Sequence, residues 1–84
     1  MHNYNYLHQI ENFLQTNDAT SFTPADGRNI DFVSQGDGEN AIIKIDRGAI
    51  YNTSSPKEFY DNTFEILRNY NEDEETIYRI FYDY

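Results

Sequence analysis

The chain has 84 residues and a formal net charge of −9, from 15 acidic and six basic side chains. This length fits one domain, residues 1–84, whose small core buries roughly 60–65% of the unfolded surface. The absence of cysteine excludes disulfides and thiolate metal or redox sites. Six Phe and eight Tyr, at helical and strand spacings, exceed what a disordered segment usually carries. We therefore expect a folded domain whose acidic surface repels nucleic acid and anionic lipid and attracts basic partners.

Residues 1–17 have the spacing of an amphipathic helix. A single apolar stripe follows the helical period and consists of Tyr6, Leu7, Ile10, Phe13 and Leu14. Asn3 or Asn5 can cap the start of this helix, and Asn17 can end it in the left-handed conformation. His2 and His8 are too few for a zinc site, so we interpret both as solvated.

Residues 18–52 predict an antiparallel sheet of three or four strands. Candidate strands are residues 22–23, 28–34, 39–46 and 49–51, separated by turn sequences at 24–27, 35–38 and 46–48. Connections this short make neighbouring strands antiparallel. One face is consistently apolar and contains Ile30, Phe32, Ala41, Ile43 and Ile45. Helices must cover this face, because a sheet of this size cannot hide it alone.

Residues 55–84 predict two further helices. The first starts at Ser55-Pro56-Lys57-Glu58, with Pro at the first helical position and a capping-box spacing. Its expected inward positions are Phe59, Tyr60, Thr63, Phe64, Leu67 and Tyr70. Asn71, with Glu74 three residues later, resembles the cap of a last helix over residues 72–82. In that helix Ile77, Ile80, Phe81 and Tyr84 are expected to point inward. The predicted class is α+β: an N-terminal helix, a three- to four-stranded antiparallel β-meander and two C-terminal helices.

No motif of a known catalytic chemistry is present. The chain has no Gly-x-Ser-x-Gly elbow, no phosphate-binding glycine loop and no His-Glu-x-x-His. Residues 26–31 and 37–40 supply oxygen ligands but lack the spacing and closing glutamate of a calcium loop. We therefore expect no enzymatic activity, no cofactor and no metal.

The acidic, tyrosine-rich surface is the remaining candidate for a binding site. Eight tyrosines are more than this core can bury with their hydroxyls satisfied, and exposed Tyr is enriched at protein interfaces. Carboxylates spaced along helices and turns can imitate a row of DNA phosphates. The predicted partner-binding residues are Asp37, Glu39, Asp61, Glu65, Tyr70, Glu72, Asp73, Glu74, Glu75 and Tyr78. For residues 72–75, pairing with the dipole of the last helix is an equally good explanation.

A single acidic domain of this length and layout resembles the small phage-encoded anti-CRISPR proteins, some of which imitate DNA to block a Cas9-type nuclease. The resemblance covers layout and charge across the whole chain and rests on no matched motif. It implies an inhibitor that docks on the arginines with which the nuclease reads DNA.

We therefore expect a non-enzymatic inhibitor that binds a basic nucleic-acid-binding protein, such as a Cas nuclease, and binds neither nucleic acid nor membrane. The first ten residues lack the basic region and apolar run of a signal peptide, so the expected location is the cytoplasm of a bacterial host. Two alternatives stay open. One is an immunity protein or antitoxin that neutralises a basic nuclease toxin, and the other is a structural domain that self-associates through its tyrosines.

Overall fold

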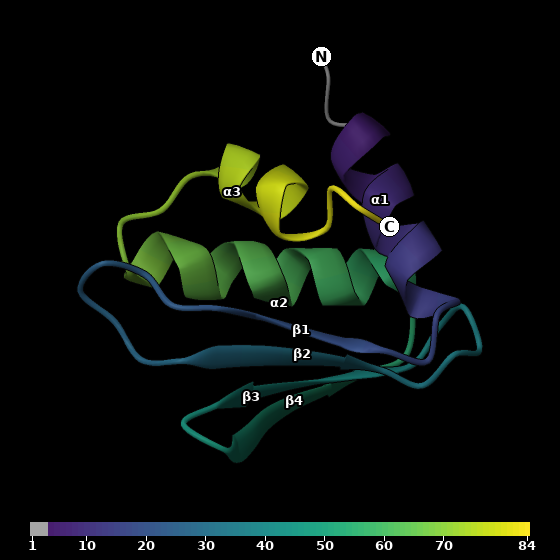
Figure 1. Cartoon of the computed structure of the whole chain (residues 1–84), viewed down its shortest axis with the longest axis horizontal. Coiled ribbons are helices and arrows are strands. Elements are labelled where there is room, and N and C mark those ends of the chain that lie inside the picture. Colours follow the sequence, from purple (N-terminus) through teal and green to yellow (C-terminus); the bar gives the residue numbers. More distant parts are fainter. Residues whose placement is uncertain (1–3) are drawn as a thin grey trace.

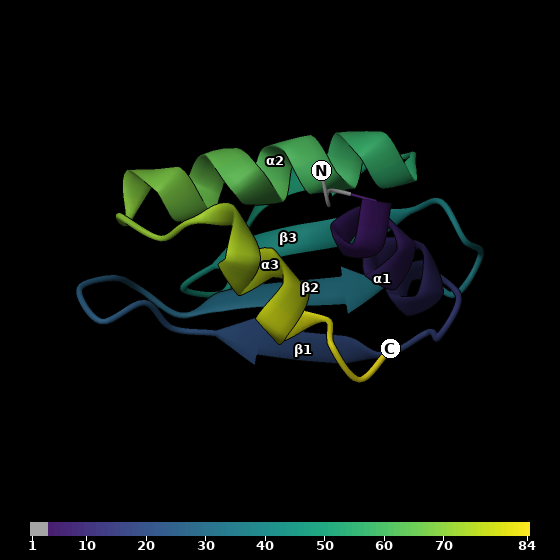
Figure 2. The same ribbon diagram turned by 90° about the horizontal axis from the view of Figure 1, so that it is seen from above.

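The computed structural model describes residues 4–84 and arranges them in two layers, one of helices and one of strands (Figure 1). The helices are α1 (Tyr4–Leu14), α2 (Pro56–Asn69) and α3 (Glu74–Ile80). The strands are β1 (Ala19–Phe22), β2 (Ile30–Ser34), β3 (Ala41–Ile45) and β4 (Gly48–Thr53). All three helices lie on the same side of the sheet (Figure 1, Figure 2). The predicted α+β class and order of elements are confirmed.

The sheet is a meander in which each strand pairs antiparallel with the next, in the order β1-β2-β3-β4. Phe32 in β2 lies opposite Thr20 in β1 and Ile43 in β3, so these three side chains face the helices. The β3–β4 pairing contains an irregularity after Ile43, which leaves one extra residue in β4. β1 covers residues 19–22 rather than the predicted 22–23, because its pairing with β2 decides its length.

Four phenylalanines form the centre of the core. Phe13 of α1, Phe32 of β2, Phe59 of α2 and Phe81 after α3 are each fully buried. The Phe13 and Phe81 ring centroids are 4.9 Å apart, and those of Phe32 and Phe81 are 5.3 Å apart. Aromatic contacts of this kind stabilise beyond the area they bury. They connect both layers and all three helices through one cluster.

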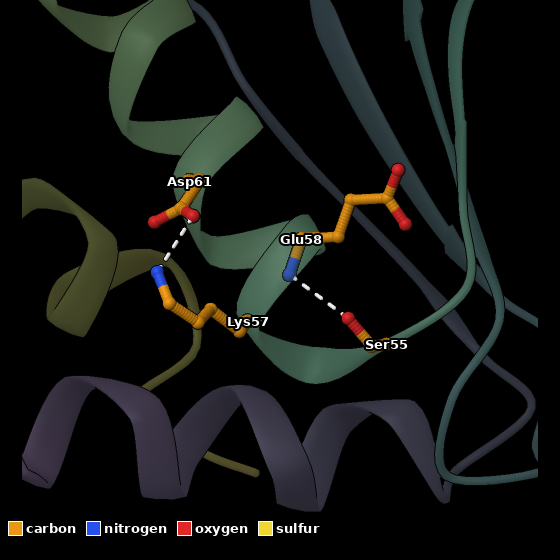
Figure 3. Close-up of polar contacts among 4 residues, drawn as sticks. All are labelled: Ser55, Lys57, Glu58 and Asp61. Atoms are coloured by element: carbon orange, nitrogen blue, oxygen red, sulfur yellow. Dashed lines mark hydrogen bonds and ion pairs between the residues drawn. The ribbon is translucent and has the colours of Figure 1, made fainter.

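The start of α2 is confirmed as predicted. The Ser55 Oγ accepts a hydrogen bond of 3.1 Å from the Glu58 backbone N–H, and Pro56 occupies the first helical position (Figure 3). The reciprocal half of the capping box is displaced by one residue. The Glu58 carboxylate accepts from the Ser54 backbone N–H at 2.9 Å. Two backbone donors are still satisfied, so the cap retains its function.

The prediction that Asn71 caps the last helix is wrong. Asn71 has a positive φ of 63° and ends α2 instead. Its N–H donates to the Arg68 carbonyl at 3.0 Å, and the Glu72 N–H donates to the Leu67 carbonyl at 2.9 Å. These two bonds form a Schellman motif, in which Asn tolerates the left-handed position. The N-cap of α3 is Asp73, and the helix covers residues 74–80 rather than 72–82.

The other helix boundaries and inward positions differ in detail. α1 ends at Leu14, although Asn17 has the left-handed φ of 53° that was predicted for it. Asn3 lies outside the described residues, and Asn5 lies within α1 rather than before it. Along α2 the fully or nearly fully buried residues are Phe59, Thr63, Ile66 and Leu67. Ile66 was not predicted, whereas three predicted inward residues are half-buried: Tyr60, Phe64 and Tyr70.

The end of the chain is held against α1 and β1. The Gln9 amide of α1 donates to the carbonyls of Phe81 and Tyr82 at 2.9 and 2.8 Å, which satisfies acceptors at the end of α3. The Tyr84 ring meets Phe13 edge to face, with centroids 5.0 Å apart. The Tyr84 hydroxyl lies 3.3 Å from the Asp18 carboxylate. Burial, followed by the charge of Asp18, raises the pKa of this hydroxyl.

Candidate functional site

The predicted binding residues do not form one surface, because they lie in the β2–β3 loop, along α2, in the α2–α3 connection and on α3. Asp37 and Glu39 lie in the β2–β3 loop, beside the C-terminal end of α1 (Figure 1). The α2–α3 connection lies at the other end of the sheet in both views (Figure 1, Figure 2). We call residues 15–18 and 35–40 the loop end. We call Glu72, Asp73, Glu74, Glu75, Tyr78 and Tyr82 the α3 face.

The loop end is acidic and contains no Lys or Arg. Two backbone hydrogen bonds join its loops to their neighbours: Gly38 N–H to the Leu14 carbonyl at 2.9 Å, and Ser34 N–H to the Asp18 carbonyl at 2.8 Å. The carboxylates of this region belong to Asp18, Asp37 and Glu39. Asp18 was not among the predicted site residues. Its position beside the β2–β3 loop depends on tertiary packing, so no local signal marks it.

Asp37 organises its own loop. Its carboxylate accepts hydrogen bonds from the Asn40 backbone N–H (2.7 Å), the Asn40 side-chain amide (2.6 Å) and the Glu39 backbone N–H (2.8 Å). These bonds, those of Asn40 first, lower the pKa of Asp37 to about 2. The carboxylate is therefore ionised at neutral pH, but its acceptor positions are used to hold the hairpin connection.

The acidic residues of α2 are partly balanced by neighbouring bases. The Lys57 ammonium lies 2.9 Å from the Asp61 carboxylate, one helical turn away (Figure 3). Glu65 is exposed and lines a shallow hollow of about 210 Å³ together with Arg68 and Asn69. The Arg68 guanidinium lies 5.8 Å from the Phe64 ring centroid, on the same helix. α2 therefore offers less free negative charge than its sequence suggests.

The α3 face combines four consecutive carboxylates with two tyrosines. Glu74 and Glu75 lie in the first turn of α3, Asp73 is its N-cap and Glu72 precedes it. The Thr76 hydroxyl lies 3.1 Å from the Glu72 carboxylate and 3.3 Å from that of Asp73, so it donates to one of them. These contacts and the positive end of the α3 dipole stabilise the charges where they are.

The tyrosines of the predicted site have different roles. Tyr70 is half-buried, and a side chain at Gly27 would meet its ring, since an added Cβ would lie 2.7 Å from Cδ1. Tyr70 therefore packs against the β1–β2 loop. Tyr78 and Tyr82 meet edge to face with centroids 5.2 Å apart, and Tyr82 is 59% exposed. Tyr82 was not predicted, although its spacing of four residues from Tyr78 is a helical signal that could have identified it.

Few of the carboxylates are neutralised within the molecule. Among the described residues, acid–base contacts within 4.0 Å that involve Lys or Arg join Arg28 to Asp46 and Lys57 to Asp61. His8 lies 3.9 Å from Glu11. All 15 acidic residues lie within residues 11–83, so 13 of the 15 carboxylates have no Lys or Arg partner at this distance.

Two shallow hollows lined by described residues do not have the lining typical of a ligand pocket. A second shallow hollow, of about 450 Å³, is lined by Asn29, Asp46 and Arg47. The described lining residues of both hollows are polar or charged, whereas small-molecule sites are mostly apolar. Within residues 4–84, no group of three or more His, Asp or Glu is placed to hold a metal ion. No helix among these residues is long and apolar enough to cross a membrane.

Comparison with known proteins finds no family model, no curated protein and no solved structure that matches the chain. Its function must therefore be argued from the charges and side chains on its surface.

Proposed function

We propose that the chain is a non-enzymatic inhibitor that binds a basic nucleic-acid-binding protein, such as a Cas-type nuclease, through the α3 face. The observation that carries this proposal is that carboxylates without a Lys or Arg partner lie next to a tyrosine pair, formed by half-buried Tyr78 of α3 and exposed Tyr82 in the turn that follows. Glu75 and Tyr78 are three residues apart and thus share one side of α3, and the Tyr82 ring, in the turn after the helix, packs against the Tyr78 ring. This combination suits arginine, which pairs with carboxylates and stacks on aromatic rings.

The charge density supports imitation of DNA in part. The Cα positions of the molecule span 31 Å along its longest axis. A DNA duplex of that length carries about 18 negative charges, at one per about 1.7 Å. The chain carries −9, about half of that density. We therefore expect it to compete with DNA for a basic groove, with tyrosine contacts supplying the part of the affinity that charge does not.

The test begins with capture of the partner. The chain is immobilised and exposed to nuclease-treated bacterial lysate, and proteins released by a salt step are identified by mass spectrometry. The dissociation constant of each purified candidate is then measured at 50 and 300 mM NaCl. We expect at least tenfold weaker binding at the higher salt and full competition by duplex DNA. A partner whose binding is insensitive to both would contradict the proposal.

Two double variants with the same net charge locate the surface. Glu74→Gln with Glu75→Gln removes two charges from the α3 face and leaves Asp73, the N-cap residue of α3, unchanged. Glu11→Gln with Glu39→Gln removes two exposed or half-exposed charges elsewhere. We expect the first pair to weaken binding at least tenfold and the second less than threefold. Equal effects would mean that net charge alone drives association, and the α3 face would then be rejected as the site.

A further inference from the structure

The face of the sheet that the helices leave open has an unusual composition. The strand register places two rows of side chains on it. One row consists of Ala19, Val33, Ile42 and Asn52, and the other of Ser21, Asp31, Lys44 and Ala49, with Ile50 beside it. Five of these nine residues are apolar, whereas the solvated face of an antiparallel sheet is usually polar. We call these nine residues the open face.

Ile50 is the most conspicuous member of the open face. Ile43 pairs with Tyr51 and Lys44 with Ala49, so Ile50 is the extra residue of the irregularity in β4. In a bulge, both residues of the bulged strand lie opposite one residue of the neighbour, here Lys44. Ile50 is 50% exposed, which is high for a large aliphatic side chain. It extends the apolar strip formed by Val33 and Ile42 to the edge of the sheet.

The open face is also electrically neutral in a strongly acidic molecule. It contains one acid, Asp31, and one base, Lys44, which lie opposite each other on β2 and β3. All other residues together carry 14 acids and five bases, so the full −9 lies outside this face. The Asp31 carboxylate is held by the Ser21 hydroxyl and the Asn29 amide, and no described Lys or Arg nitrogen lies within 4.0 Å of it.

We infer that a second copy of this chain packs on the open face, sheet against sheet, about a two-fold axis. Two molecules of charge −9 repel each other in every orientation, and they repel least where two neutral surfaces meet. A two-fold interface is self-complementary, so Lys44 of each copy can meet Asp31 of the other. The apolar rows then face each other across about 10 Å, with strand directions about 30° apart, as in a β-sandwich.

The size of the face sets the strength of this dimer. Four strands spaced by about 4.8 Å, with about five residues each at 3.4 Å, cover roughly 320 Å² of flat area. A stable interface buries about 800 Å² per partner, so the dimer is a weak and reversible one. We expect a dissociation constant on the order of 10⁻⁴ M. Salt screens the repulsion between the copies, so the dimer strengthens as NaCl is raised, opposite to the expected partner complex.

The experiment is a concentration series of the purified chain from 20 µM to 1 mM, at 50 and 300 mM NaCl. Sedimentation velocity measures the mass, and amide chemical shifts report which residues change surroundings. We expect the dimer to form as the protein concentration rises from 20 µM to 1 mM, and to a greater extent at 300 mM NaCl. The changes in amide chemical shift should be concentrated at Val33, Ile42 and Lys44. A monomer at 1 mM in both salts would overturn the inference. Shifts confined to the β4 edge or to α3 would do so as well.

Complementary variants test the geometry. Asp31→Lys and Lys44→Glu each give the open face two like charges. Each variant alone should therefore have a dimer dissociation constant at least tenfold higher than that of the wild type. Mixed in equal amounts, they should recover it, because the altered faces then carry opposite charges. Tyr82, like Ile50, is a large apolar side chain that is exposed, but it lies outside the open face. Tyr82→Ser is therefore the matched control, and it should leave the dimer dissociation constant unchanged. Failure of the mixture to recover, or loss of the dimer in Tyr82→Ser, would overturn the inference. Circular dichroism confirms that each variant is folded.

Discussion

Two threonines in the helical layer are fully buried, and they differ in one respect. The Thr63 hydroxyl of α2 has no hydrogen-bond partner among the described residues, whereas the Thr76 hydroxyl of α3 contacts carboxylates and accepts a bond of 3.1 Å from Arg79. An unpaired buried hydroxyl costs about 1–3 kcal/mol, and Val has the same shape without it. We therefore expect Thr63→Val to raise the free energy of unfolding by about 1 kcal/mol. Urea denaturation at pH 7 measures this.

Thr76→Val is the matched control for the same chemical change. It removes a donor to Glu72 or Asp73 and an acceptor for Arg79, so we expect a loss of about 1–2 kcal/mol. Opposite signs for the two substitutions would confirm that the partners decide the effect. If Thr63→Val is as destabilising as Thr76→Val, the hydroxyl of Thr63 must be satisfied in solution.

Asp37 gives the fold a pH dependence of known sign. Its folded pKa of about 2 lies below the unfolded value of 3.8, so the ionised form stabilises the native state. This contribution is complete above about pH 4 and is lost as the pH falls toward 2. We expect Asp37→Asn to be less stable than the wild type at pH 6, with the difference shrinking between pH 4 and 2. Urea midpoints measured across pH 2–6 test this.

Glu39→Gln provides the comparison within the same loop. No hydrogen bond to the Glu39 side chain joins it to the described residues, so we expect its midpoint to follow the wild type across this range. A difference at Asp37→Asn that stays constant down to pH 2 would show that geometry, rather than charge, holds the β2–β3 loop.

At the scale of elements, one contact ties the end of α2 to the β1–β2 loop. The Tyr70 ring lies so close to Gly27 that a Cβ would come within 2.7 Å of Cδ1 and 3.0 Å of Cε1. The ring is half-buried and packs against the core as well as against the loop. We therefore expect Gly27→Ala to lower the free energy of unfolding by about 1–3 kcal/mol, as overpacking does.

Gly48→Ala is the control for the loss of a glycine. A Cβ at Gly48 has ordinary contact with the Ile45 carbonyl at 3.5 Å. Reduced freedom of the unfolded chain should therefore leave stability unchanged or raised by up to about 1 kcal/mol. If both substitutions have the same effect in urea denaturation, the contact between Tyr70 and Gly27 contributes nothing specific.

The elements that the sequence predicted well are those with local signals. The start of α2 is encoded by Ser55 and Pro56, and the inward side of β2 and β3 by alternation, so both were identified. The prediction for Asn71 failed because Asn suits both the start of a helix and a left-handed helix end. Only the two backbone hydrogen bonds to α2 decide between these positions. β1 has little alternation of its own and takes its length from β2.

The candidate site was predictable in type but not in layout. Sequence composition gives the number of carboxylates, and their grouping in space depends on the meander. The β2–β3 loop and the α2–α3 connection come to opposite ends because β2 and α2 run in opposite directions along the sheet (Figure 2). Asp37 and Asp61 also acquire partners, in Asn40 and Lys57, that a list of charges does not reveal.

For the whole molecule, the two proposed surfaces lie on opposite layers. The α3 face belongs to the helical layer, and the open face is the other side of the sheet (Figure 1). A dimer formed through the open faces would therefore turn both helical layers outward and present two α3 faces. The two associations would not compete for surface, and their opposite dependence on salt separates them in solution.

The same excess of charge should govern the stability of the monomer. At 0.01 M salt the Debye length is about 30 Å, comparable to the 31 Å extent of the molecule, so its carboxylates repel one another across the whole fold. At 1 M the length is about 3 Å and this repulsion vanishes. We expect the melting temperature at 5 µM protein, where the chain is monomeric, to rise by about 5 °C between these salts. A variant with Gln at positions 11, 39, 74 and 75 has a net charge of −5 and should gain less than half as much. An equal gain in the variant would assign the effect to salting-out of apolar surface rather than to charge.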